Sequence, residues 1–124
     1  MAYLGVTMPE NTREWDCEHV SASEAGDYFQ VMFAKAPASD EEYLLIQRQF
    51  ESPDNGKCYV ETDDPAFCGH YRIVAAQLSR NRFLISLADA PLKNVVVSFN
   101  ATESDYAEAK RVLLIMAPEL EVQE

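Results

Sequence analysis

The sequence contains few glycines and prolines, and no long hydrophobic run. Four glycines and six prolines in 124 residues exclude a collagenous or low-complexity chain, and a hydrophobic fraction of 48% excludes a disordered one. No apolar run approaches the roughly 20 residues that cross a bilayer. Residues 1–15 lack a basic stretch followed by an apolar core, so we expect no secretory signal. The composition indicates one domain over residues 1–124, with residues 1–13 expected to be loosely ordered.

Cysteine and histidine are also scarce. An odd count of three cysteines, without an export signal, predicts reduced thiols and a cytoplasmic protein. We interpret Cys17, Cys58 and Cys68 as small, partly buried side chains. Neither Cys17 with His19 nor Cys68 with His70 has the spacing of structural zinc ligands. We therefore expect no metal and no cofactor.

A convergent set of catalytic groups is missing as well. A cysteine nucleophile needs a separate histidine base, and Cys68 and His70 are too close in sequence to pair easily. The chain has no glycine-rich loop that would cradle a phosphate. The adjacent acids Asp63 and Asp64 on a turn are expected to point apart. The sequence therefore predicts a protein that is not an enzyme, and the enzyme alternative would depend on Cys68 and His70.

Basic residues are outnumbered by acidic ones, which gives a net charge of −11. Residues 1–64 hold 14 acids and 4 bases, a net of −10, whereas residues 65–124 hold 7 acids and 6 bases, a net of −1. A field of this sign repels nucleic acid and anionic membranes, and it attracts basic partners. Solubility alone explains many acidic surfaces. The charge favours a basic protein partner and argues against nucleic-acid or membrane binding.

Alternating apolar and polar residues predict neighbouring antiparallel strands. Arg80-Asn81 is expected to join two strands in a hairpin, and Ser52–Gly56 is a turn signal. The other predicted strands cover residues 14–22, 28–33, 42–50, 57–61 and 92–99.

The alternation also predicts which side chains share a face. In the first strand the set on one side is Trp15, Cys17, His19 and Ser21. In the strand over residues 42–50 the more apolar set is expected to face the core, and it consists of Leu44, Ile46, Arg48 and Phe50.

The hydrophobic period changes near the end of the chain. Apolar residues follow the spacing of an amphipathic helix over residues 102–116, at Tyr106, Ala109, Val112, Leu113 and Met116. Asn100 or Thr102 can cap this helix, and Pro118 marks its end. The sequence therefore predicts an α+β domain, with an antiparallel β-sheet packed against one C-terminal α-helix.

Several of these motifs, taken in order, resemble a known family. They are Tyr43-Leu44-Leu45-Ile46-Gln47-Arg48, then Tyr59-Val60-Glu61 with Asp63-Asp64, then the gap to Tyr71 and the hairpin from Val74 to Leu87. This pattern is similar to immunity protein family ten of bacterial polymorphic toxin systems. With the following strand and helix, the resemblance covers about residues 43–116. It implies a non-enzymatic protein that binds and neutralises a cognate toxin domain.

The acidic turn beside the tyrosines is the predicted toxin-binding site. Its residues are Tyr59, Glu61, Asp63, Asp64 and Tyr71. Clustered acids mimic phosphates, so such a surface could occlude the basic cleft of a nuclease toxin. Two alternatives stay open: the tyrosines could simply pack across strands, and the protein could be a small ligand- or peptide-binding α+β module without catalytic activity. The sequence leaves the oligomeric state open.

Overall fold

A curled, mixed β-sheet and one α-helix form the part of the chain that the computed structural model describes, residues 12–26, 28–35, 42–49 and 56–123. The strands are β1 (Thr12–Cys17), β2 (His19–Ala25), β3 (Tyr28–Ala34), β4 (Tyr43–Gln49), β5 (Lys57–Thr62), β6 (Gly69–Ser79), β7 (Arg82–Ala88), β8 (Asn94–Phe99) and β9 (Leu120–Val122). The helices are the short 3₁₀ turn η1 (Pro65–Phe67) and α1 (Glu103–Met116).

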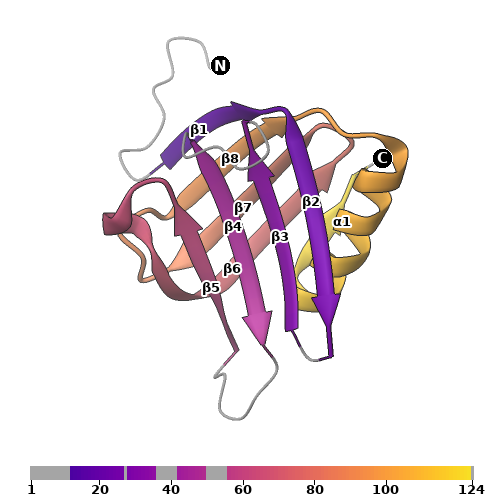
Figure 1. Ribbon diagram of the computed structural model, residues 1–124. Coiled ribbons are helices and arrows are strands. Elements are labelled where there is room, and N and C mark those ends of the chain that lie inside the picture. The colour runs from indigo at the N-terminus through magenta and orange to yellow at the C-terminus, as the bar shows by residue number, and fades with distance from the viewer. Residues whose placement is uncertain (1–11, 27, 36–41, 50–55, 124) are drawn as a thin grey trace.

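The sheet folds back on itself into two facing layers. Its strand order is β1-β8-β7-β6-β5-β4-β3-β2, and β9 pairs with β6 outside this path. In Figure 1 the front layer, β2 to β5, lies over the back layer of β8, β7 and β6. Helix α1 lies behind β2 and contacts β2 and β3. The core occupies the space between the layers and the helix.

A one-residue bend connects the two edges of this sheet. β1 pairs with β8 up to Cys17, and β2 pairs with β3 from His19, so only Glu18 separates the two edge strands. The Glu18 N–H donates to the Ala34 carbonyl at 3.0 Å, which anchors the bend to β3.

Because of this bend, the side chains that face inward differ from those predicted for the first strand. Trp15 and Cys17 are buried, but His19 and Ser21 are exposed and Val20 is buried instead, so the four residues do not share one face. The bend at Glu18 shifts the alternation by one position, so the inward set changes from odd to even residues. The prediction of one continuous strand over residues 14–22 was wrong at this point.

The prediction of an antiparallel sheet is correct only in part. Among the described strands, β1 with β8 and β6 with β9 are parallel pairs, and the remaining pairs are antiparallel. Parallel pairing needs a long connection between the partners, so neighbouring turns in the sequence do not reveal it. The helix near the C-terminus is confirmed, but the short strand β9 follows it.

Helix α1 has the cap and the buried face that the sequence predicts. The Thr102 hydroxyl accepts a hydrogen bond from the Asp105 N–H at 3.0 Å, which identifies Thr102 rather than Asn100 as the N-cap. All five predicted apolar residues of the helix are buried. No helix within the described ranges is long and apolar enough to span a membrane.

The front layer contributes both apolar and charged groups to the interior. Leu44 and Ile46 are fully buried, as predicted, and Phe33 stacks on Phe83 at 5.1 Å between ring centroids. Arg48 Nη1 donates to the Met116 carbonyl oxygen at 2.7 Å. This contact satisfies a carbonyl at the end of α1 and places a cation at the negative end of the helix dipole.

Some predictions fall wholly or partly outside the described residues. Phe50 and residues 52–55 of the predicted turn lie outside the described residues. Gly56, the last residue of that turn, is described and has a positive φ of 71°. Of the stretch predicted to be loose, Thr12 and Arg13 are ordered in β1, and residues 1–11 lie outside the described ranges. The hairpin turn at Arg80-Asn81 is confirmed between β6 and β7.

Candidate binding surface

The outer face of the front layer is the candidate functional surface, because no other described helix or strand covers it (Figure 1). Two rows of side chains cross this face, as the strand register shows. The first row is Ser23, Gln30, Gln47, Tyr59 and His70, and the second is Ser21, Met32, Leu45 and Glu61. We call these nine residues the outer face.

The nine residues of the outer face carry little charge although the chain as a whole is strongly acidic, and the paired cations Lys57 and Arg72 border them in the next row. Glu61 is its one carboxylate, and tyrosine, methionine, leucine and glutamine fill its middle, half-buried by their neighbours. The centres of protein interfaces are likewise depleted in charged residues and enriched in tyrosine and methionine. The composition of the outer face is therefore typical of a protein-binding surface.

Glu61 is held between two tyrosines. The Tyr43 hydroxyl donates to Glu61 Oε2 at 2.5 Å, and the Tyr59 hydroxyl donates to Glu61 Oε1 at 2.8 Å. The hydrogen bond to Glu61, reinforced by burial, raises the pKa of Tyr59 to about 12. Burial first, and then the hydrogen bond to Glu61, raises the pKa of Tyr43. Glu61 contributes to both shifts because a tyrosinate here would lose its bond to the carboxylate and be repelled by it, and burial adds to them because it disfavours the charged form.

The tyrosine pKa shifts predict how stability changes at alkaline pH. Because its pKa is raised, Tyr59 stabilises the native state fully below about pH 10, the ordinary tyrosine pKa. This stabilisation is lost as the pH rises from there to about 12. Glu61→Gln removes the repelling charge, so the tyrosine absorbance titration should shift to lower pH. The thermal unfolding temperature should also fall less steeply as the pH rises through the alkaline range. Titration curves that superimpose for wild type and Glu61→Gln would contradict this account, with Glu121→Gln on β9 as the control.

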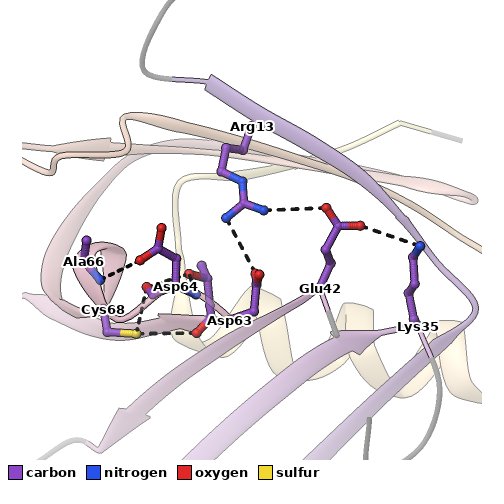
Figure 2. Close-up of polar contacts among 8 residues, drawn as sticks. Arg13, Lys35, Glu42, Asp63, Asp64, Ala66 and Cys68 are labelled. Carbon is purple, nitrogen blue, oxygen red and sulfur yellow. Dashed lines mark hydrogen bonds and ion pairs between the residues drawn. The ribbon is translucent and has the colours of Figure 1, made fainter. Parts of the chain in front are cut away.

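The other two acids of the predicted site are engaged with the protein itself (Figure 2). Asp63 Oδ1 lies 3.6 Å from Arg13 Nη1. Asp64 is the N-cap of η1: its Oδ1 accepts the Ala66 N–H at 3.0 Å, and its own N–H donates to Thr62 Oγ1 at 3.1 Å. These two acids therefore fix the turn after β5.

Arg13, in β1, links the acidic turn to Glu42, which precedes β4. Its Nη2 lies 3.6 Å from Glu42 Oε2, and Lys35 Nζ lies 3.7 Å from Glu42 Oε1 (Figure 2). Its guanidinium also lies 4.7 Å from the centre of the Trp15 ring. Arg13 was not among the predicted site residues, because residues 1–13 were expected to be loosely ordered, whereas Arg13 lies in β1. Only the parallel pairing of β1 with β8 brings this residue to the acidic turn.

Tyr71 does not share the outer face with Tyr59. It pairs with the buried Cys58, packs against the core, and its hydroxyl donates to the Cys68 carbonyl at 3.4 Å. The neighbouring His70 points outward instead, and its ring centroid lies 5.2 Å from that of Tyr59. Alternation along β6 accounts for the difference. Tyr43, and not Tyr71, is the second tyrosine at the site, because its hydroxyl donates to Glu61. The sequence signal that could have identified it is its position at the start of the motif Tyr43–Arg48.

The cysteines lie apart from this surface. Cys17 and Cys58 are buried, and burial raises the pKa of the Cys17 thiol to about 11. Cys68 Sγ lies 3.6 Å from the carbonyl oxygens of Thr62 and Asp64. Within the described ranges, no group of three or more His, Cys, Asp or Glu side chains could hold a metal ion.

Comparisons with known proteins returned no relative: no family model, no curated protein and no solved structure matches this chain. The resemblance of residues 43–116 to immunity proteins therefore stays a prediction. The function must be argued from the surface and from the sequence.

Proposed function

We propose that this protein is a non-enzymatic immunity protein, which binds a cognate bacterial polymorphic toxin domain in the cytoplasm and neutralises it by occlusion. The observation that carries the proposal is the outer face. It is left open by the rest of the described chain, it is poor in charge, and it holds one carboxylate between two tyrosines.

The outer face suits a protein partner because it is rigid and broad. Strands β3 and β4 are hydrogen-bonded to neighbours on both sides, so little backbone order has to be gained on binding. Tyrosine supplies a large contact area at a low cost in side-chain entropy. Met32 and Leu45 pair across β3 and β4 and add apolar area at the centre.

The net charge of −11 favours a basic toxin domain. A protein field of this size steers an oppositely charged partner and raises the association rate. A nuclease toxin has to present basic residues to phosphates. We therefore propose a nuclease as the toxin, with the outer face covering its basic cleft.

Co-expression with the toxin domain encoded next to this gene tests the proposal. Wild type should protect the cells and co-purify with the toxin. Gln47→Arg places a bulky cation in the middle of the outer face and should abolish protection, because an unpaired charge would be buried there and would repel a basic partner. Gln77→Arg, on β6 of the back layer, is the matched control and should still protect.

Two results would overturn the proposal. If wild type neither protects nor co-purifies with the toxin domain, the immunity function is wrong. If wild type protects and Gln47→Arg protects equally well, the binding surface is not the outer face. Circular dichroism of both variants shows whether each one is folded.

A further inference from the structure

Glu61 has no cation partner within the described ranges, unlike Asp63 and Glu42, and unlike Asp64 it does not cap a helix. Asp63 pairs with Arg13, Glu42 pairs with Arg13 and Lys35, and Glu24 pairs with Arg111 at 2.7 Å. The contacts of Glu61 are the two neutral hydroxyls of Tyr43 and Tyr59. Its negative charge is therefore held in place by the protein but not neutralised by it.

The two hydroxyls leave part of the carboxylate available. An ionised carboxylate offers about four lone-pair sites, and each tyrosine uses one of them. The hydrogen bonds from both sides fix the orientation of the carboxylate, so a bound cation would not have to order it.

The surroundings of Glu61 match one kind of ligand. The rings of Tyr59 and His70 lie 5.2 Å apart on the same face and offer aromatic surface beside the carboxylate. A guanidinium binds carboxylates through paired N–H groups and stacks on aromatic rings, and an ammonium also binds both groups. Leu45, directly across from Glu61, offers apolar surface to the methylenes of such a side chain.

We infer that Glu61, held by Tyr43 and Tyr59, is the receptor site for one arginine or lysine side chain of the protein partner. The inference rests on the proposed function and deepens it: among Glu61, Asp63 and Asp64, Glu61 makes the direct contact. Asp63 and Asp64 shape the turn and add to the long-range field.

Binding kinetics with the neighbouring toxin domain test the inference. Glu61→Gln keeps the size of the side chain and removes its charge, and dissociation should become roughly 10- to 100-fold faster, as expected for a lost charge-assisted hydrogen bond. Glu121→Gln on β9 makes the same change in net charge away from the outer face, and its dissociation rate should equal that of wild type. Asp63→Asn should change association more than dissociation.

The outcomes separate the inference from the proposed function. If wild type binds the toxin and Glu61→Gln dissociates at the wild-type rate, the receptor site is wrong while the immunity function stands. If wild type does not bind the toxin, the function fails, and the site is tested with a short arginine peptide in an amide NMR titration. The peptide should then shift the Leu45 and Tyr59 signals of wild type and not those of Glu61→Gln. Equal shifts in both proteins would refute the site.

Discussion

Replacing Leu113 by alanine should lower the free energy of unfolding by about 2–5 kcal/mol, because the change removes buried methyl groups and leaves a cavity. Leu113 is 1% exposed on the face of α1 that packs into the core. The helix packs mainly on β2 and β3, and a close-packed core relaxes only in part around such a cavity. Chemical denaturation followed by circular dichroism measures the change.

The adjacent Leu114 provides a matched control for this prediction. It is 44% exposed and lies about 100° around the same helix from Leu113. Leu114→Ala removes the same atoms and slightly improves helix propensity, so the free energy of unfolding should change by less than about 0.5 kcal/mol. Equal effects from the two substitutions would show that α1 does not pack on the sheet with the face described.

Replacing Tyr59 by alanine should weaken toxin binding by roughly 30-fold or more, the effect of truncating an interface hot spot. Tyr59 lies in the first row of the outer face, between Gln47 and His70, and it donates a hydrogen bond to Glu61. The substitution removes the ring and releases the carboxylate. Most of the loss in affinity should appear as a faster dissociation rate, because truncating an interface anchor has little effect on the association rate.

Two phenylalanine variants separate the ring from the hydroxyl. Tyr59→Phe keeps the ring and loses only the hydrogen bond to Glu61, so its effect should be smaller than that of Tyr59→Ala. Tyr71→Phe is the matched control, because Tyr71 packs against the core and its hydroxyl contacts only the Cys68 carbonyl among the described residues. A Tyr71→Phe variant that weakens binding as much as Tyr59→Ala would place the interface elsewhere.

The candidate site could be predicted from the sequence only in part. The sequence located Tyr59, Glu61 and the acids after them on one strand and turn, and the structure brings Tyr59 and Glu61 together on the outer face. It could not show that Asp63 is paired with Arg13, 50 residues away, or that Asp64 caps η1. Nor did it separate Tyr71 from His70, because the face of β6 that turns inward depends on pairing with β5.

Local patterns in the sequence are enough to predict several of the elements. Helix α1 follows from a 3.6-residue period and a threonine cap, and β3, β4 and the β6–β7 hairpin follow from alternation and a short turn. Each of these signals lies within about 15 neighbouring residues, where side-chain periodicity and capping act directly. The net charge of −11, which favours a basic partner, is also a property of the sequence alone.

The meeting of distant segments depends instead on long-range contacts in the folded chain. The bend at Glu18, the parallel pairing of β1 with β8 and the return of β9 along β6 depend on contacts between residues far apart in the sequence. Such contacts leave no local period to detect, because their free energy arises from burial and pairing after the chain has closed long loops. These contacts also decide the site, since they give Asp63 an arginine and leave Glu61 with two tyrosines.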